Sequence, residues 1–501
     1  MNDYLIRVIL SLENSLVRSA GKGGLGELEA DIFLGRRETE DNGEKWLFFT
    51  PLYGKILKQE YVDGEIVTRV LDFGIPKTLR LVDSFGIELK NESIKIEVYE
   101  HSLSTNNTKA YFLYSDCFNH PIYEAGDIRK EIRTSCCFVR GVVEYLKRHK
   151  ISPHFLHLNE SEAFFLLPYL NSSPTVYFHS HTPEPHGHKR FYIEDLKSSL
   201  NEEEIERLKV AQEGEMINMG KYAATVSKGI VCVSRQHAEV TKYLYPMFED
   251  KIISITNGIH RRWIGEEWER LFDEEISGWR KDARLLERVK EISDKKMVET
   301  KEEEMENFES YIIKKIESKE AVGNFDSKKL SFVYAKRLTE YKRPLHAFSL
   351  LDLEINLVLS GPPVDEIGRR TLEEIKRLSK MGYPVVYVLN YNSEVAKNLL
   401  KAYAWLNLAY FAREASGTSY EKALMNGTLL ITTSCGSVPE FIKDEYNGFL
   451  VKDDLSDLRD KAKRAIEVYN DKNEWAKMIK NCFSTYSVLI DRVIEEFKKL
   501  R

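Results

Sequence analysis

The sequence is poor in the features that mark several large classes of protein. Its 27 glycines and 14 prolines make up about 8 % of the 501 residues, below the usual ~12 %, which excludes collagen-like and loop-dominated folds. No apolar run approaches the ~18–20 residues of a membrane-spanning helix, so we expect no membrane partner. The formal net charge is only −6. Because nucleic-acid binding needs a clustered basic surface, we expect no nucleic-acid partner either.

Cysteine is also scarce. The six cysteines show no Cys-x-x-Cys spacing, and they stand mostly in apolar runs, so we expect buried, reduced thiols in a cytoplasmic protein. The apolar stretch at 4–12 is short and contains Arg7, whereas a signal peptide needs a longer uninterrupted core. We therefore interpret residues 4–10 as a first strand.

The sequence does contain an alternation of short apolar strands and helical segments, and this alternation occurs twice. It predicts an α/β protein with two doubly wound units built on largely parallel sheets. Helices are predicted at 129–147 and 201–226. The predicted strands are 46–50, 94–99, 110–114, 155–158, 175–179, 230–233 and 252–256 in the first unit, and 330–335, 355–359, 384–389, 428–433 and 448–451 in the second.

The segment between the two alternations, 266–320, is dense in Glu and Lys and has apolar residues at helical spacing. We interpret it as a pair of solvated helices. The expected domains are an N-terminal Rossmann-like domain (1–263), a charged helical connection (264–325), a C-terminal Rossmann-like domain (326–485) and a last helix (486–501) packing back on the first domain. Two such domains are expected to face a central cleft, where ligands bind beyond the carboxyl ends of strands.

Two polar segments follow strands in the first half. In the Gly-Lys-Gly-Gly-Leu-Gly sequence at 21–26, Gly23 and Gly24 would let backbone N–H groups approach an anion at a helix N-terminus, although a ligand-free turn explains the glycines as well. The segment 178–188 holds four of the twelve histidines, including His181. Because no Cys or carboxylate spacing accompanies them, we expect one His to contact substrate and no metal site.

Two further segments have the composition of an anion site. Residues 335–344 place Lys336, Arg337, Lys342 and Arg343 directly after an apolar strand. This arrangement predicts a phosphate site, with a solvated basic loop as the alternative. In 414–427, Ser, Gly and Thr residues precede a short helix that ends at a glycine, which presents backbone N–H groups to an anion or to sugar hydroxyls. A helix cap is the simpler explanation of the hydroxyls.

Taken together, the motifs resemble the α-glucan phosphorylases, which are retaining glycosyltransferases of the GT-B fold. The resemblance runs in order along most of the chain. Its most specific segments are 405–407 and 414–427. The matching segments are 23–26, 157–160, 181–183, 233–237, 256–263, 336–343, 405–407 and 414–427. The chain is much shorter than animal and bacterial members, so it resembles a compact form.

The resemblance implies a role for each matching residue. Lys422 matches the lysine that holds pyridoxal phosphate as a Schiff base, with Thr418, Ser419 and Lys336 at the cofactor phosphate and Trp263 packed nearby. Arg337, Lys342 and the backbone of Gly23 and Gly24 would bind the substrate phosphate. The glucosyl hydroxyls would contact His181, Asn257, Tyr341, Glu414, Ser416 and Gly417. Of these, Arg337, Lys342, His181 and Glu414 are the implied catalytic residues.

The implied reaction is phosphorolysis of α-1,4-glucan or maltooligosaccharide to glucose 1-phosphate. A phosphate held by Arg337 and Lys342 can stabilise positive charge at the anomeric carbon and then capture the sugar on the same face.

The sequence departs from the family at Tyr420 and Glu421, just before the cofactor lysine. Residues 434–440 and 447–451 look more like glycogen synthases, so a glucosyltransferase using ADP- or UDP-glucose, without pyridoxal phosphate, stays open. Many such enzymes carry a second acidic residue eight positions after the first. Counted from Glu414, that position in this chain is Lys422. A homo-oligomer and a non-catalytic glycan-binding relative also stay open.

Overall fold

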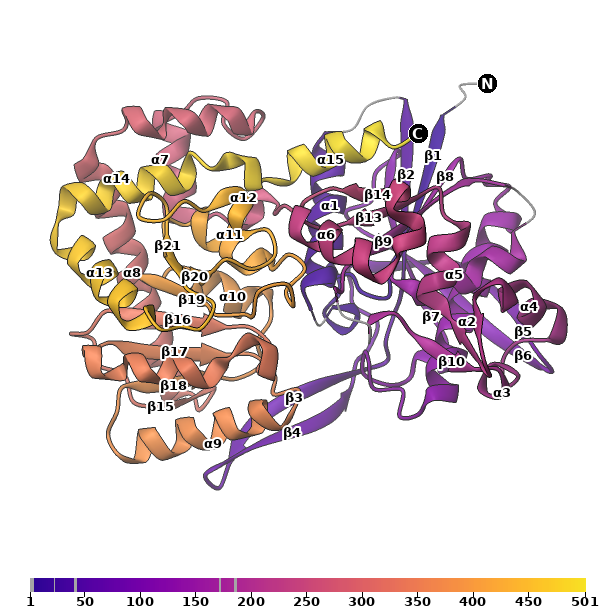
Figure 1. The fold of residues 1–501 in the computed structure, drawn as a ribbon, viewed down its shortest axis with the longest axis horizontal. Helices are drawn as coiled ribbons and strands as arrows, with labels where there is room; N and C mark the ends of the chain where they lie inside the picture. The colour runs from indigo at the N-terminus through magenta and orange to yellow at the C-terminus, as the bar shows by residue number, and fades with distance from the viewer. Residues whose placement is uncertain (1–3, 22, 40–42, 171–172, 184–186) are drawn as a thin grey trace. The chain divides into compact units, whose positions relative to one another are not determined.

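The computed structural model describes residues 4–21, 23–39, 43–170, 173–183 and 187–501. Lys22 of the glycine-rich segment and residues 184–186 of the histidine-rich segment lie outside the described residues. The chain forms two compact units. Unit 1 comprises 1–57, 70–256 and 493–501, and unit 2 comprises 58–69 and 257–492 (Figure 1).

The described part of unit 1 is built on a nine-stranded sheet in the order β14-β13-β9-β8-β1-β2-β7-β6-β5. The strands from β14 to β7 are parallel, and β6 and β5 add an antiparallel edge. Their bounds are β1 (Leu5–Leu10), β2 (Glu44–Pro51), β5 (Leu79–Leu89), β6 (Glu92–His101), β7 (Thr108–Tyr114), β8 (Phe155–Asn159), β9 (Thr175–Ser180), β13 (Gly229–Cys232) and β14 (Ile252–Ser254). The central strands are almost wholly apolar and buried, as in sheets covered on both faces.

The helices of unit 1 are α1 (Gly24–Glu38), α2 (Ile128–Arg148), α3 (Ile193–Leu196), α4 (Glu202–Leu208), α5 (Met219–Val226) and α6 (Arg235–Leu244). The single helix predicted at 201–226 is wrong. The chain instead forms α4, the short strands β11 (Gln212–Glu213) and β12 (Met216–Asn218), and then α5. Gly214, at φ +61°, sits in the turn between the two strands and separates the helices. β12 also pairs with β10 (Arg190–Tyr192).

The described part of unit 2 is built on a seven-stranded sheet in the order β15-β18-β17-β16-β19-β20-β21, parallel except for β15. Its strands are β15 (Ala321–Gly323), β16 (Ser331–Ala335), β17 (Asn356–Ser360), β18 (Val385–Val388), β19 (Ala404–Asn407), β20 (Leu429–Thr433) and β21 (Phe449–Val451). Its helices are α7 (Glu266–Glu275), α8 (Asp294–Glu317), α9 (Glu366–Lys380), α10 (Ser393–Leu399), α11 (Thr418–Leu424), α12 (Val438–Phe441), α13 (Leu458–Asn470) and α14 (Lys472–Phe483). Figure 1 shows α9 beside the β15 end of this sheet.

The structure differs from the predicted domain limits in two places. Residues 264–325 are part of unit 2 rather than a solvated connection, because Trp268 and Phe272 of α7 stack on Phe483 of α14 in the core. The hairpin of β3 (Lys55–Val62) and β4 (Glu65–Asp72) contributes 58–69 to unit 2, where Gln59 exchanges backbone and side-chain hydrogen bonds with Asn390. The sequence signal for 264–325 was its charge, and charged helices still bury one face.

The chain crosses between the units for the last time near the start of α15 (Ile490–Lys499), since residues 493–501 belong to unit 1. Within unit 1, the ring of Phe497 packs on Trp46, His157 and His179. Arg7, fully buried and ion-paired with Glu44, donates to the carbonyl of Leu500 at 3.0 Å. The final helix is therefore anchored by both apolar packing and a buried guanidinium.

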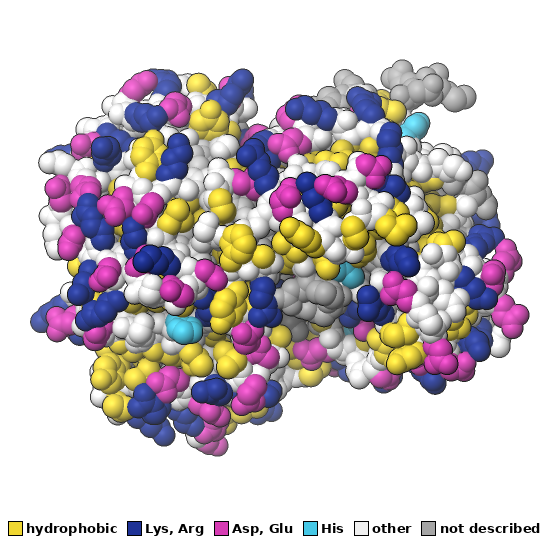
Figure 2. Space-filling model, viewed as in Figure 1, with side chains coloured by type: hydrophobic (Ala, Val, Ile, Leu, Met, Phe, Trp, Pro, Cys, Tyr) yellow, Lys and Arg dark blue, Asp and Glu magenta, His cyan; other side chains and the backbone are white. Residues whose placement is uncertain are grey.

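Cys117 and Cys137 form a disulfide, so the expectation of six reduced thiols is wrong for these two. The pair joins α2 to the short turn 116–118, two segments that the spacing of cysteines in the sequence does not connect. Cys136, Cys232, Cys435 and Cys482 are free and buried, as expected. Among the residues described, no helix is both long and apolar enough to cross a membrane. On the face drawn in Figure 2, acidic and basic side chains are intermixed.

Candidate active site

The basic segment of unit 2 forms a loop at the carboxyl end of β16. Asp365, at the N-terminus of α9, fixes this loop by accepting hydrogen bonds from the Thr339 hydroxyl at 2.5 Å and the Glu340 N–H at 2.7 Å. The chain then turns at Arg343, which has φ +55°, and Pro344 begins the next helical turn. The predicted cations are thus held at one strand end by a carboxylate that the sequence reading did not assign.

Lys342 and Glu414 form an ion pair in this loop. The Lys342 Nζ lies 2.5 Å from the Glu414 Oε2, and the two side chains are 10 % and 12 % exposed. Burial opposes both charges, but Lys342, then Lys336 and Arg337, lower the pKa of Glu414 below its ordinary value. Against the same cost of burial, Glu414 raises the pKa of Lys342. Both groups are therefore charged at neutral pH.

Lys336 is a second buried cation beside this pair. Its Nζ donates to the Asn407 Oδ1 at 2.5 Å, at the end of β19. Burial, followed by repulsion from Lys342, lowers the pKa of Lys336 to about 7. A bound anion would restore the ordinary lysine charge, so this residue is suited to holding phosphate.

Arg337 and Tyr341 lie at the solvent side of the loop. Arg337 is exposed, and one of its guanidinium nitrogens lies 3.5 Å from the Tyr341 hydroxyl. The Lys342 Nζ lies 5.1 Å from the centre of the Tyr341 ring. Five of the predicted site residues therefore form one cluster, comprising Lys336, Arg337, Tyr341, Lys342 and Glu414.

The second predicted loop, 414–421, lies against the segment that begins unit 2. The Asn257 Nδ2 donates to the Ser416 carbonyl at 3.2 Å, and the Ser416 hydroxyl lies 2.5 Å from the hydroxyl of Ser437. Gly417 precedes α11, and Thr418 and Ser419 form its first turn, with Thr418 buried. The structure therefore places Asn257 against Ser416, next to Gly417.

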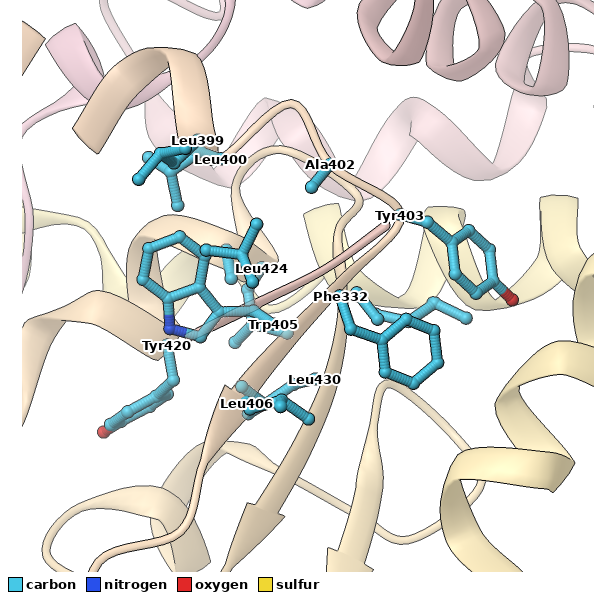
Figure 3. Close-up of a cluster of buried hydrophobic side chains, with 14 of the residues drawn as sticks. Phe332, Leu399, Leu400, Ala402, Tyr403, Trp405, Leu406, Tyr420, Leu424 and Leu430 are labelled. Atoms are coloured by element: carbon cyan, nitrogen blue, oxygen red, sulfur yellow. The ribbon is translucent and has the colours of Figure 1, made fainter. Parts of the chain in front are cut away.

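Lys422 lies on the indole of Trp263. Its Nζ is 3.5 Å from the ring centre, the side chain is 6 % exposed, and Trp263 is 1 % exposed. Tyr420 and Leu424 seat the helix that carries Lys422 in the core, where both residues lie beside Trp405 (Figure 3). Since these two residues occupy the core side of α11, the lysine is directed to a different face.

The two residues that depart from the family pattern are both buried. The Tyr420 hydroxyl donates to Glu421 Oε1 at 3.2 Å and also contacts the Ser437 hydroxyl. Burial raises the pKa of Glu421 well above its ordinary value, and its Oε2 has no hydrogen-bond partner among the described atoms. Burial therefore favours the neutral form of Glu421, against the opposing effect of the charges on Arg492 and Lys422.

These residues fit a pyridoxal phosphate group. Lys422 supplies a buried primary amine, and Trp263 supplies a flat aromatic face beside it. Lys336, whose charge is disfavoured without an anion, supplies a phosphate partner. The raised pKa of Glu421 reduces the negative charge that this residue would place beside an anionic cofactor.

The remaining predicted residues, His181, Gly23 and Gly24, lie in unit 1. The His181 Nε2 lies 2.7 Å from the Asn159 Oδ1, and burial lowers the pKa of His181 to about 3, so the ring is neutral. The backbone N–H of Gly23, at the start of α1, donates to the Glu13 carboxylate at 2.7 Å. The strand ends bearing His181 and Asn159 are thus part of one hydrogen-bonded group, separate in the chain from the cations of unit 2.

Sequence reasoning missed several polar residues that support the site. Asn407 holds Lys336, Asp365 holds the basic loop, Ser437 contacts Ser416, and Asn426 contacts the Lys422 segment. Asn407 carried a usable signal, because it is the polar residue that ends an apolar strand. Among the described residues, no group of His, Cys, Asp and Glu has the arrangement of a metal site.

Known proteins match this chain in both its sequence and its fold. A family model described as Carbohydrate phosphorylase matches residues 188–357, and one described as Glycosyl transferases group 1 matches 315–484. The catalytic domain of Starch Synthase IV from Arabidopsis thaliana, bound to ADP and acarbose, superposes with a TM-score of 0.75 at 17 % identity over 99 % of both chains. The chain is thus similar in sequence to phosphorylases and to group 1 glycosyltransferases, and its fold is GT-B.

Curated relatives of this phosphorylase-like chain extend over much of its length. Maltodextrin phosphorylase from Thermococcus litoralis is 25 % identical over 79 % of this chain and 54 % of its own length. Glycogen phosphorylase from Aquifex aeolicus is 28 % identical over 41 % of this chain and 35 % of its own. The chain thus spans about half or less of the phosphorylases it matches. An uncharacterized protein from Methanocaldococcus jannaschii matches over 78 % of this chain and 77 % of its own.

Proposed function

We propose that the protein catalyses retaining glucosyl transfer, namely phosphorolysis of α-1,4-glucan or maltooligosaccharide to glucose 1-phosphate with pyridoxal phosphate. The observation that carries this proposal is the buried Lys422 amine on the Trp263 face, within the segment that also supplies Glu414. The similarity to maltodextrin and glycogen phosphorylases supports it. A cation stands where many nucleotide-sugar transferases carry a second acid.

The reaction requires an anion to be held beside a developing cation. The substrate phosphate gives its proton to the departing 4-oxygen as the glucosidic bond breaks, and one of its oxygens then bonds to the anomeric carbon on the same face. Lys342 and Arg337 would bind the phosphate, while Glu414 keeps Lys342 charged and in place. Because the Lys342–Glu414 pair is preorganised and largely buried, its field acts with little loss to water.

Lys422 would hold the cofactor, with Thr418, Ser419 and Lys336 at its phosphate and Trp263 against its ring. When bound, the cofactor would supply a second phosphate group able to exchange a proton with the substrate phosphate. Lys336 would regain a full positive charge next to that anion, since its low pKa comes first from burial without a partner. In unit 1, neutral His181 would donate or accept hydrogen bonds to sugar hydroxyls.

A synthase-like transfer from ADP- or UDP-glucose is the second candidate. The starch synthase match over nearly the whole of both chains and the group 1 match at 315–484 favour it. The same cations would then bind a diphosphate. Lys422 would act as a charge partner of that diphosphate or of Glu414.

Four measurements on the purified protein separate the two candidates. Near-ultraviolet absorbance detects bound pyridoxal phosphate, and borohydride reduction followed by peptide mass spectrometry locates it. Phosphate-dependent release of glucose 1-phosphate and elongation from ADP- or UDP-glucose are assayed in parallel. We expect pyridoxyl on Lys422 and release of glucose 1-phosphate. A colourless protein that elongates glucan only from a nucleotide sugar would overturn the first candidate.

Cellular location and assembly follow from the same proposal. A glucan-phosphorolysing enzyme acts where sugar phosphates are kept, so a cytoplasmic location is proposed. A homo-oligomer remains a prediction that analytical ultracentrifugation tests.

A further inference from the structure

Asn426 joins the two segments that carry Trp263 and Lys422. It lies in the turn after α11 and is 1 % exposed. Its Nδ2 donates to the carbonyl of Trp263 at 2.8 Å and to the carbonyl of Lys422 at 2.7 Å, and its Oδ1 accepts from the Gly265 N–H at 2.8 Å. Since both amide hydrogens and the acceptor are used, the side chain fixes the spacing of the two segments.

A buried ion pair supports Asn426 from behind. The Lys301 Nζ donates to the Asn426 carbonyl at 2.9 Å, to the Thr428 hydroxyl at 2.8 Å and to the Glu304 Oε2 at 3.1 Å. Lys301 and Glu304 are both 0 % exposed. Buried pairs of this kind are often no more stabilising than apolar residues of similar volume, so stability alone is a weak reason for the pair. Its geometric effect is to hold the turn at Asn426.

Gly265 completes the arrangement. A Cβ at this position would run into the Glu304 Oε1 and would lie 3.2 Å from the Asn426 Oδ1. The backbone that leads from Trp263 into α7 therefore passes directly against the Asn426 side chain. In addition to core packing, one amide therefore links the backbone that carries the indole to the backbone that carries the lysine.

We propose that Asn426 is the positioning residue that sets the Trp263 indole against the Lys422 amine. The proposal rests on the proposed function in one respect, namely that Lys422 is the cofactor lysine. Asn426 acts through Trp263 and Lys422, and it would not itself contact cofactor or substrate.

The test is Asn426→Ala against the control Asn447→Ala. Asn447 is equally buried at 1 % and makes the same pattern of bonds in unit 2, accepting from the Lys443 N–H and donating to the Phe441 carbonyl and the Thr485 hydroxyl. Both variants lose a buried amide, but only one loses the link to Lys422. Cofactor-free protein is labelled with acetic anhydride, and peptide mass spectrometry gives the rate at Lys422 relative to Lys295, which is 82 % exposed.

We expect the relative labelling rate of Lys422 to rise about fivefold or more in Asn426→Ala, the change that loss of one net hydrogen bond makes to an opening equilibrium. Asn447→Ala should leave the rate unchanged while lowering the unfolding midpoint similarly. In Trp263→Phe the rate should also rise, and adding Asn426→Ala should raise it no further, because the two changes act on one contact.

An equal rise in both asparagine variants, or no rise in Asn426→Ala, would overturn the proposal. If Asn426→Ala does not fold, Asn426→Asp keeps the volume and the acceptor for Gly265, but it sets a carboxyl oxygen against two carbonyls, and the same rise is expected. Because labelling uses no cofactor, the result is independent of the pyridoxal measurement. Absence of pyridoxal would defeat the proposed function and leave the Asn426 contact standing.

Discussion

A group of buried histidines and glutamates in unit 1 is held neutral, whereas the basic loop of unit 2 holds a buried ion pair in its charged form. In unit 1, burial lowers the pKa of His179 and of His181 to about 3 and raises the pKa of Glu160 and of Glu29 to about 8. The His157 Nδ1 lies 2.9 Å from the His179 Nε2, so neutral rings are linked by hydrogen bonds. These side chains therefore offer hydrogen-bond donors and acceptors without net charge.

Unit 2 instead keeps a buried lysine and a buried glutamate ionised by pairing them. Lys342 and Glu414 offset each other's cost of burial, and Lys336 is left as a cation whose charge is only half retained at neutral pH. A bound anion would stabilise the charged form of Lys336. The neutral side chains described in unit 1 have no such unbalanced charge for an anion to offset. Uncharged sugar hydroxyls suit the first kind of surface, and phosphate suits the second. Under the proposed function, this difference predicts that the group in unit 1 contacts sugar and that the basic loop of unit 2 contacts phosphate.

The largest effect is expected from Lys342→Met. Breaking a buried ion pair costs about 3–5 kcal/mol when one charge is left behind, unless the partner takes up a proton. Removing a preorganised cation from the transition state costs a further ~100-fold or more in turnover. Thermal unfolding and initial rates measure the two effects separately. Lys342→Met/Glu414→Gln is the control, because it should recover stability and not turnover. Full activity in Lys342→Met would contradict the assignment of the charged Lys342–Glu414 pair as the anion-binding centre of unit 2.

Arg337→Ala should reduce turnover without the loss of stability. Arg337 is exposed, and its contact with the Tyr341 hydroxyl is long at 3.5 Å, so the fold loses little. One charge-assisted contact to phosphate is worth roughly 1.5–3 kcal/mol, or about 10–100-fold in rate. The matched control is Arg413→Ala, an arginine of the same unit that pairs with Glu340. Equal losses in both variants would mean that general surface charge, rather than Arg337, binds the anion.

The sequence predicted the parallel strands well because their signal is local. Residues 331–335, 356–360 and 385–388 are continuous apolar runs, and each forms a buried strand within a residue of the predicted limits. The edge hairpin of β3 and β4 had no such signal, since β4 is mostly exposed. Its strand β3 joins the rest of unit 2 through Gln59, which bonds to Asn390, 331 positions away in the chain. No local pattern predicts a contact of that range.

The site was predictable to a similar degree. The cations of the basic loop were identified from their position after an apolar strand, and the structure clusters them with Glu414. Asn426 could not be identified in this way, because an Asn-Gly pair after a helix is typical of an ordinary turn. Only the tertiary structure brings its amide to the carbonyl of Trp263, 163 positions away. Supporting residues of this kind depend on long-range contacts rather than on composition.

Lys336→Met should weaken anion binding and stabilise the protein. The folded protein releases the Lys336 proton near pH 7, while an unfolded lysine keeps it to about pH 10.5. The unfolded state therefore binds more protons between these values, and stability rises with pH across this window. The thermal unfolding midpoint of Lys336→Met should exceed that of wild type by a few °C below pH 7. This difference should vanish toward pH 10.5. Phosphate titration should show roughly tenfold weaker binding. A midpoint lower than wild type at pH 6 would contradict the conclusion that burying the charged Lys336 side chain destabilises the fold.

The smallest effect is expected from Glu160→Gln in unit 1. The Glu160 Oε1 accepts from the Thr182 hydroxyl, and its Oε2 has no partner among the described atoms. The folded protein keeps the Glu160 proton up to about pH 8, whereas the unfolded chain loses it near pH 4.5. The folded state thus binds more protons between these values, and this residue lowers stability as pH rises through the window.

Glu160→Gln should match wild type at pH 5 and become progressively more stable than wild type up to pH 8. Urea unfolding at both pH values measures the difference, with the exposed Glu203→Gln as a control that should show no such trend. If Glu160→Gln loses stability at pH 8, then Glu160 is ionised in the folded protein, and the neutral character assigned to unit 1 fails at this residue.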